Sequence, residues 1–495
     1  MSNIRVTYSG LIAFVIGLLS VGTGLVFTLI ITRRLAPEEF GTWALIGTMI
    51  SYFLISEAII DFWTFRQVVR GEKVGKTSLF SSALFSLASI PLYMILAFII
   101  SDQSKVDFNI LVLGFILLPV YFLSQALTQI NSAFQPQKTS YSLMIFEISK
   151  IPTALSFVYF LDLGVIGAII AILIAYIIKI GFQLYFAKSK LKDRLNFQFL
   201  KRWFKFSWIS LYSQFPKLLT SLDIFLYTLI TGSVIGIAFY SAAFVISNLV
   251  AHSSLISQAL FPKLLAKGSH EHINENFSLL MYFAIPLLGL SVIFSKPALF
   301  ALNPAYIDGT LIVILLSFKT FFLVLDQTLQ RILVSIDTVD VEVNPKFRSL
   351  LKSNLFHMST VRFIKVGIYL FTFVTTLVFL HTTELDEVFL VTIWALITLI
   401  IEIPFFIYMW ILTKRYIKFS FPYVSTLKYL GTTLAFGIVF VFASEQIIIY
   451  HESIFNFLPT VILMFVICVG IYLLITYLID NKTKKLFKSI INEIS

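Results

Sequence analysis

The sequence has little of three things that would assign it to a familiar class: cysteine, charge and catalytic motifs. A single cysteine, Cys468, excludes an internal disulfide framework and a Cys-rich metal site. Charged residues make up only 13% of the chain, against about 25% in soluble domains. No Gly-rich phosphate loop, Ser/His/Asp set or HExxH motif occurs. We therefore expect neither a secreted disulfide scaffold nor an enzyme, and we expect no cofactor and no metal.

Apolar sequence is present in excess along the whole length. The 495 residues are 58% hydrophobic and have a mean hydropathy of +0.92. Runs of about 20 apolar residues recur from end to end, long enough to cross about 30 Å of hydrocarbon as helices. The first run, 10–32, is too long for the apolar region of a cleaved leader, so we interpret it as a span. These features predict an all-α polytopic membrane protein.

Hydropathy predicts about fourteen transmembrane helices joined by short loops. Their expected positions are 10–32, 41–61, 79–100, 108–130, 141–160, 164–187, 206–231, 234–260, 278–300, 310–330, 361–380, 388–412, 425–444 and 457–479.

Charge in the loops sets the orientation of these spans. With the N-terminus inside, 27 of the 37 Lys and Arg residues fall in inner loops and tails, and only Arg33, Arg34, Lys105 and Lys296 fall in outer loops. This asymmetry follows the positive-inside rule. It predicts a multi-pass protein of the cell membrane with both termini in the cytoplasm. The net charge of +11 then reflects topology and attraction to anionic inner-leaflet lipid, with no reason to invoke nucleic acid.

The most basic loop divides the chain after six spans. We predict an N-terminal lobe at 1–187, a cytoplasmic basic linker at 188–205, a C-terminal lobe at 206–412, and two additional helices with a basic tail at 413–495. Interleaved aromatic and basic residues in the linker favour an amphipathic helix lying on the membrane surface, with a merely solvated connector as the alternative.

The two predicted lobes share a short repeat. PEEFGTWAL (37–45) and VIGIAFYSA (234–242) each place a small residue two positions before an aromatic one, with Gly41 and Ala238 in equivalent places. Six spans per lobe is an even number, so the lobes would share one orientation. They would be related by a pseudo-twofold axis along the membrane normal.

Three lysines, Lys150, Lys217 and Lys319, fall about ten residues into their spans, near the predicted midplane. A lysine there costs about 2.5–3.5 kcal/mol to insert, so we expect all three to face an interior or a wet cavity. Glu147 can meet Lys150 on one helix face, three residues away. Asp223 lies six residues after Lys217 and points in a different direction.

Other charges lie at depth or at the inner edge of spans. Arg66 and Arg70 sit at the inner mouth, while Arg362 and Lys365 are expected to snorkel from the inner edge of span eleven. The acids could serve a coupling ion or make plain interhelical contacts, and nothing in the sequence ranks them: Glu57, Asp61, Asp223, Asp326 and Glu402. Interhelical ion pairs that only hold the bundle together are the alternative for the lysines as well.

Several segments in order resemble the polysaccharide-transporter, or Wzx-type, flippases of the multidrug/oligosaccharidyl-lipid/polysaccharide (MOP) superfamily. They are RRLAPEEFGTWALIG (33–47), IIDFWTFRQVVRGE (59–72), SLDIFLYTLITGSVIGIAFYSAAFVISN (221–248) and ALFPKLL (259–265). Ala238 stands where glycine is more common in that family. The resemblance extends from span one to about span twelve.

The resemblance implies two six-helix lobes around a central cationic cavity, in some members with two added C-terminal helices. It also implies movement of a polyprenyl-(di)phosphate-linked oligosaccharide from the inner to the outer leaflet. The partners would then be the lipid-linked glycan, an ion gradient of H+ or Na+, and glycan-assembly enzymes. Arg66, Arg70, Lys150, Lys217 and Lys319 are the expected substrate-binding residues.

Two other functions remain open from the sequence. A multidrug or organic-cation exporter of the same superfamily would have a cavity dominated by acids, whereas lysine dominates the midplane here. An integral glycan polymerase or ligase would need a large outer loop for catalysis, and every predicted outer loop is short.

The orientation predicts which positions react with a membrane-impermeant thiol reagent. In a Cys468→Ser background, single cysteines at 103, 162, 384 and 452 should be labelled in intact cells. Cysteines at 72, 195, 344 and 486 should be labelled only after permeabilisation. Labelling of position 195 in intact cells would contradict the two-lobe topology.

Overall fold

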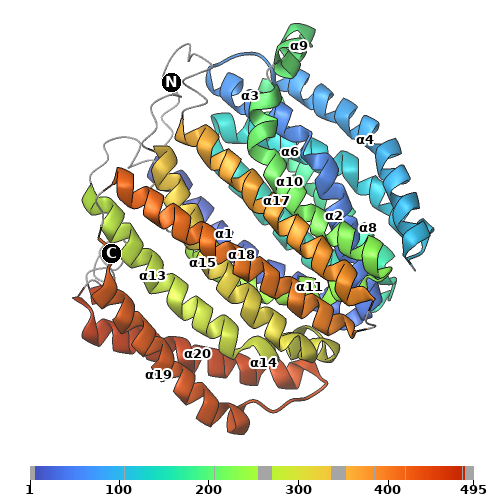
Figure 1. The fold of residues 1–495 in the computed structure, drawn as a ribbon. Coiled ribbons are helices and arrows are strands. Elements are labelled where there is room, and N and C mark those ends of the chain that lie inside the picture. Colours follow the sequence, from blue (N-terminus) through green and yellow to red (C-terminus); the bar gives the residue numbers. More distant parts are fainter. Residues whose placement is uncertain are drawn as a thin grey trace. The chain divides into compact units, whose positions relative to one another are not determined.

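The structure, a computed structural model, describes residues 6–104, 106–205, 207–254, 270–335, 353–382, 385–417, 420–481 and 483–484. Within these ranges all regular secondary structure is helical (Figure 1). Helices satisfy every internal backbone N–H and C=O within one segment, as hydrocarbon requires. The chain divides into two compact units, Met1–Ala238 with Val374–Glu384 and Phe239–Phe373 with Leu385–Ser495.

The first unit runs from the N-terminus to the start of α11. Its elements are α1 (Val6–Arg34), α2 (Pro37–Leu54), α3 (Glu57–Val69), α4 (Gly75–Gln103), α5 (Phe108–Leu113), η1 (Gly114–Ile116), α6 (Leu117–Phe134), α7 (Pro136–Ala154), η2 (Leu155–Phe160), α8 (Gly164–Ala187), η3 (Lys188–Lys190), α9 (Phe197–Lys205) and α10 (Ser207–Thr231). Helix α6 packs against α3, α4 and α8, and α7 packs between α1 and α8.

The second unit holds the remaining helices. They are α11 (Ile235–Ser247), η4 (Asn248–Ser253), α13 (His270–Ile293), α14 (Ser295–Leu302), η5 (Pro304–Gly309), α15 (Thr310–Ser335), α17 (Asn354–His381), α18 (Glu387–Tyr416), α19 (Tyr423–Ile447) and α20 (Ile454–Ile479). The unit boundaries fall inside α11 and α17, so each of these two helices contributes residues to both units.

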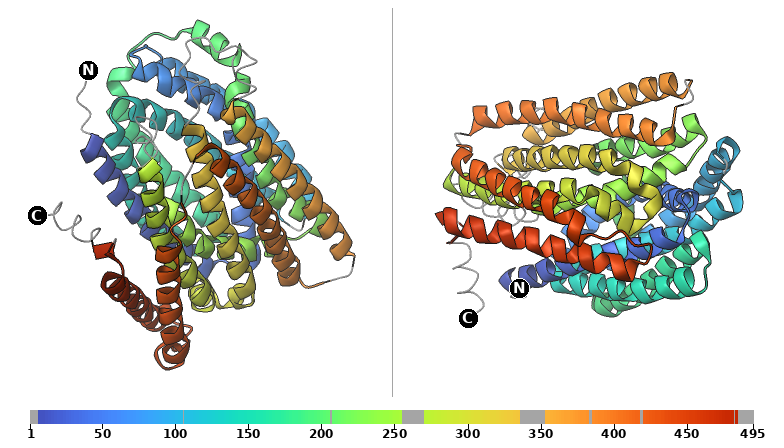
Figure 2. Two further views of the ribbon diagram at one scale, coloured as in Figure 1. Left: turned by 60° about the vertical axis from the view of Figure 1, so that its left-hand side comes forward. Right: turned by 90° about the horizontal axis from the view of Figure 1, so that it is seen from below.

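The two C-terminal helices, α19 and α20, pack against each other and against α13 (Figure 2). Phe277, Phe436 and Phe457 are fully buried in the aromatic core of this part of the second unit. The Tyr472 hydroxyl donates a hydrogen bond of 2.6 Å to the Tyr282 carbonyl, which links α20 to α13. The helices predicted to follow the second lobe are therefore packed onto it.

The prediction of an all-α polytopic membrane protein is confirmed. Among the described residues, eleven helical segments are long and apolar enough to cross a membrane, and the bent pair α2–α3 would make twelve. Two further helices, α1 and α10, lie at the predicted spans 10–32 and 206–231. The structure describes the backbone of both helices and only part of their side chains. The segment ALFPKLL (259–265) lies outside the described residues.

The compact units differ from the predicted lobes most clearly at α10, and also at the start of α11, at the end of α17 and in the inclusion of 413–495 in the second unit. Helix α10 packs against α2, α3 and α4 and is grouped with the first unit, although the second lobe was predicted to begin at 206. Packing and internal symmetry are separate properties, so the repeat at an offset of 197 residues stays a prediction.

Helix α2 approaches the chain before α11 closely at Gly41. A Cβ atom placed on Gly41 would collide with the backbone carbonyl of Val234, which no rotamer change can relieve. Gly47, two turns later on the same helix, has open space where its Cβ would lie. The glycine of the PEEFGTWAL segment is therefore required by a backbone contact inside the first unit.

Gly41→Ala should destabilise the protein by about 1–3 kcal/mol, because the backbone must shift to accept the methyl group. Gly47→Ala is the matched control and should be neutral or stabilising by up to about 1 kcal/mol, since alanine favours a helix over glycine. Thermal unfolding of the two detergent-solubilised variants measures the difference. Equal unfolding midpoints would show that the contact with Val234 does not constrain α2.

Candidate functional site

The first unit contains a cavity of about 720 Å³ among α2, α3, α6 and α10. The residues that line it are Ser51, Leu54, Ile55, Ala58, Asp61, Phe62, Phe65, Arg66, Gln125, Gln129, Gln214, Lys217, Leu218 and Ser221. All of them come from the first unit. The lining mixes cations, amides and aromatic rings with one carboxylate, serines and aliphatic side chains.

A bend between α2 and α3 gives the cavity one of its walls. The two helices meet at 57° across a break at Ile55 and Ser56. There the backbone makes tight i to i+3 hydrogen bonds, from Ser56 N to Phe53 O at 3.1 Å and from Ile59 N to Ser56 O at 3.2 Å. Such tightening redirects a helix axis. Asp61 and Arg66 on α3 consequently line the same cavity as residues of α2.

Two cationic side chains line the cavity. Lys217, on α10, is exposed and makes no ion pair among the described residues. The Arg66 guanidinium lies 3.7 Å from the centre of the Phe62 ring, a cation–π contact that holds it at the wall. Lys217 thus lines a cavity in the structure, and its role in binding substrate stays a prediction.

Acidic and amide groups also line the cavity. Gln125 and Gln129, one turn apart on α6, reach the Asp61 carboxylate. One oxygen of that carboxylate, Oδ1, is buried and has no hydrogen-bond partner among the residues that the structure describes. Gln214 adds a third amide from α10. Amides both donate and accept hydrogen bonds, so this wall can bind hydroxyl groups and water alike.

Glu57 lies one turn before Asp61 on α3, and only 1% of it is exposed. Ser82 of α4 donates a hydrogen bond to its Oε1, while Oε2 has no partner within the described part of the chain. Two carboxylates four residues apart on a helix repel each other when both are ionised. A proton or a monovalent cation held between Glu57 and Asp61 would remove that repulsion.

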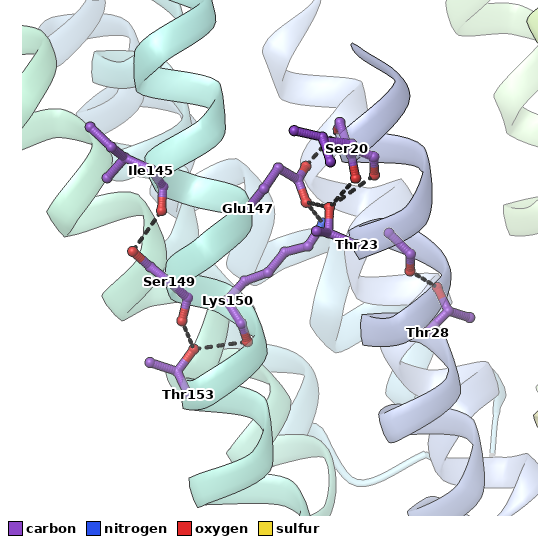
Figure 3. A network of polar contacts seen from close by, with 10 residues as sticks. Ser20, Thr23, Thr28, Ile145, Glu147, Ser149, Lys150 and Thr153 are labelled. Carbon is purple, nitrogen blue, oxygen red and sulfur yellow. Dashed lines mark hydrogen bonds and ion pairs between the residues drawn. The ribbon is translucent and has the colours of Figure 1, made fainter. Parts of the chain in front are cut away.

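Lys150 lies in a different environment, among buried polar groups between α1 and α7 (Figure 3). Its ammonium pairs with the carboxylate of Glu147, three residues earlier. That carboxylate also accepts hydrogen bonds from Ser20 at 2.8 Å and Thr23 at 2.5 Å, both on α1. Lys150 is not among the residues that line the Lys217 cavity. Its ion pair with Glu147 lies within α7, at the spacing of three residues that the sequence predicted, and α1 contributes only hydroxyl groups to the pair.

The second unit has its own charged cluster on α15, α17 and α18. Lys365 Nζ lies 2.6 Å from Glu402 Oε1 and 3.5 Å from Asp326 Oδ2. Gln330 donates a hydrogen bond of 2.8 Å to Asp326 and accepts one of 2.8 Å from Arg362 Nε. Lys365 thus contacts acids on neighbouring helices, and Arg362, which is exposed, is hydrogen-bonded to Gln330. That both cations can snorkel stays a prediction.

The other predicted site residues are dispersed. Lys319 on α15 is half-buried and interacts electrostatically with Glu402. Asp223 is buried outside the cavity lining, near the hydroxyl of Tyr52. Arg70 is exposed just past the end of α3, beyond Arg66. The structure thus brings Arg66, Lys217 and Asp61 together around one cavity.

Sequence reasoning missed the amides that complete this cavity. Gln125 and Gln129 lie four residues apart within a predicted span, on one helix face, and that spacing was a usable signal. Gln214 stands three residues before Lys217 and could have been grouped with it in the same way.

No protein-family model matches the sequence, and a comparison with curated proteins finds no match. Solved structures do match. The lipid II flippase MurJ in an inward closed conformation has a TM-score of 0.65 and 16% identity, with 94% of this chain and 98% of that chain covered. An inward-facing multidrug-resistance MATE-family transporter of the MOP superfamily has a TM-score of 0.57 and 14% identity, with 82% and 98% covered.

A MOP-superfamily transporter from Pyrococcus furiosus matches with a TM-score of 0.52 and 12% identity, with 83% of this chain and 95% of that chain covered. The chain therefore has the fold of MOP-superfamily transporters and is a multi-pass membrane protein. The matched structures are transporters rather than enzymes. At these identities the likeness concerns the fold alone.

The geometry predicts opposite consequences for the same substitution at two lysines. Lys150→Met should destabilise the protein by about 3–5 kcal/mol, because it leaves the Glu147 carboxylate buried without its cation. Lys217→Met should leave the unfolding midpoint nearly unchanged, since Lys217 is exposed to the cavity. Thermal unfolding in detergent compares them. The double variant Glu147→Gln, Lys150→Met should recover most of the loss; a stable Lys150→Met single variant would refute the structural role of the pair.

Proposed function

We propose that the protein is a flippase that moves a polyprenyl-(di)phosphate-linked oligosaccharide from the inner to the outer leaflet by alternating access. The single observation that carries the proposal is the composition of the cavity in the first unit. It combines two cations, three glutamine amides and two phenylalanine rings with one lining carboxylate.

This composition suits the polar part of a lipid-linked glycan. Lys217 and Arg66 provide positive charge for a phosphate, and an arginine fork matches phosphate geometry closely. The amides of Gln125, Gln129 and Gln214 can exchange hydrogen bonds with sugar hydroxyls. Such a cavity lowers the cost of moving a polar headgroup through the bilayer while its lipid tail stays in hydrocarbon.

The charge balance of the cavity lining favours this proposal over the exporter of organic cations. A cation exporter needs a binding surface in which acids outweigh bases, whereas Lys217 and Arg66 outnumber Asp61 here. The match to the lipid II flippase also covers 94% of this chain, against 82% for the MATE-family transporter. The larger overlap is compatible with the additional C-terminal helices, and it concerns the fold rather than the substrate.

We assign the coupling ion, H+ or Na+, to Glu57 and Asp61, because these carboxylates lie beside the cavity and have unpartnered oxygens. We propose that Asp326 and Glu402 are interhelical partners of Lys365. We propose that Asp223 makes an interhelical contact within the first unit, near Tyr52. Both termini would face the cytoplasm, where anionic lipid and glycan-assembly enzymes are the proposed partners.

Lys217→Met should lower glycolipid translocation about tenfold or more, because it removes a charge of the phosphate site at nearly constant volume. Lys217→Arg should retain most activity, and Lys188→Met, which removes an exposed cation from the linker, is the positional control. The measurement is appearance of a fluorescent polyprenyl-diphosphate glycan in the outer leaflet of proteoliposomes.

Proton and sodium gradients imposed across the same proteoliposomes identify the coupling ion. Asp61→Asn should abolish the dependence of translocation on that gradient.

The same proteoliposomes distinguish the two transport functions. Normal glycolipid translocation by Lys217→Met would refute the phosphate site. Gradient-driven uptake of a lipophilic cation such as ethidium by the unmodified protein, without glycolipid translocation, would replace the flippase with the exporter.

A further inference from the structure

The basic linker contains a short helix, α9, with three distinct faces. At about 100° per residue, Phe199, Leu200 and Trp203 share one face, and Trp203 is fully buried. Phe197 and Phe204 follow on the next face and are 63% and 49% exposed. The remaining face carries Gln198 and three exposed cations, which are Lys201, Arg202 and Lys205.

Helix α9 packs against α3, α4 and α10 within the first unit. The indole of Trp203 donates a hydrogen bond of 3.1 Å to the side chain of Gln67 on α3. Trp203 also belongs to a buried cluster with Ile59, Ile60 and Val68 of α3. The cationic face of α9 is thus held in one orientation, and Figure 1 shows the helix at the end of α3 and α4.

The aromatic face of α9 continues an apolar surface of α4. The Phe204 ring stacks on Phe85 at 5.6 Å between centroids, and the Phe197 ring meets Phe80 edge-on at 6.1 Å. Beyond these contacts α4 exposes a series of large apolar side chains suited to lipid: Leu84, Leu87, Leu92, Ile95 and Phe98. The apolar surface of α4 therefore ends where the cations of α9 begin.

A hollow lies over the cationic face, lined by Gln198, Lys201, Arg202, Phe204 and Lys205. These three surfaces follow the order of the parts of a phospholipid. The apolar surface of α4 corresponds to the acyl chains, the aromatic rings to the interface, and the cations of α9 to the headgroup. Three cations on one short helix favour an anionic headgroup over a zwitterionic one.

We propose that the cationic face of α9 is a binding site for the headgroup of an anionic bilayer phospholipid. Lys201, Arg202 and Lys205 contact its phosphate, and Phe197 and Phe204 lie beside its acyl chains. The site stands on its own contacts and does not depend on which substrate the cavity transports.

The full-length protein can report on this site through a cysteine at Gln198. Cys468 is buried, and a Cys468→Ser, Gln198→Cys variant with an environment-sensitive dye would respond at α9 alone. In phosphatidylcholine nanodiscs with increasing phosphatidylglycerol, the dye signal should saturate. The triple variant Lys201→Gln, Arg202→Gln, Lys205→Gln should raise the required phosphatidylglycerol about a hundredfold at low salt, at about fivefold per cation.

The matched control removes the same charge from the same linker. Lys188→Gln, Lys192→Gln, Arg194→Gln neutralises three exposed cations outside α9 and should shift the titration by less than about tenfold. Equal shifts in the two triple variants would overturn the headgroup site in favour of diffuse attraction. A dye response to inorganic phosphate that matches the response to phosphatidylglycerol would also overturn it, because the ligand would then be a free anion.

Discussion

The cost of placing an unpaired charge in hydrocarbon governs the arrangement of polar groups in this protein. A lysine at depth needs water, an opposite charge or an aromatic ring within reach. The structure uses all three. Lys217 lines a cavity, Lys365 lies between Glu402 and Asp326, and Lys179 lies 5.1 Å from the centre of the Tyr176 ring. The three lysines thus have three different surroundings: a cavity, two carboxylates and an aromatic ring.

Lys150 and Lys217 show how sequence neighbours decide between a structural and a functional role. Lys150 has an acid, Glu147, three residues earlier, so the ion pair forms within one helix. Hydroxyl groups of α1 donate hydrogen bonds to the carboxylate of that pair. Lys217 has its nearest acid, Asp223, six residues away on another face of α10. Without a local partner its charge stays available to a ligand. Two lysines at similar predicted depth are therefore different in chemistry.

The parts of the structure that depend on length and composition could be predicted from the sequence. The positions of the spans follow from the apolar runs, and the amphipathic character of α9 follows from its interleaved aromatic and basic residues. The role of Lys365 could not be predicted, because its partner Glu402 lies on another helix, 37 residues away. The bend at Ile55 and Ser56 has no proline or glycine to mark it, so the cavity wall that depends on it was equally hidden.

Helix α3 connects the cavity with α9 through adjacent residues. Arg66 lines the cavity, and Gln67, the next residue, accepts the hydrogen bond from Trp203. Successive residues on a helix point about 100° apart, so one short segment serves both sites without either side chain obstructing the other. Gln67 and Trp203 are both buried, and breaking their hydrogen bond would leave two polar groups without water. A movement of α3 that changed the cavity would therefore carry α9 with it, and a headgroup held by α9 would resist that movement.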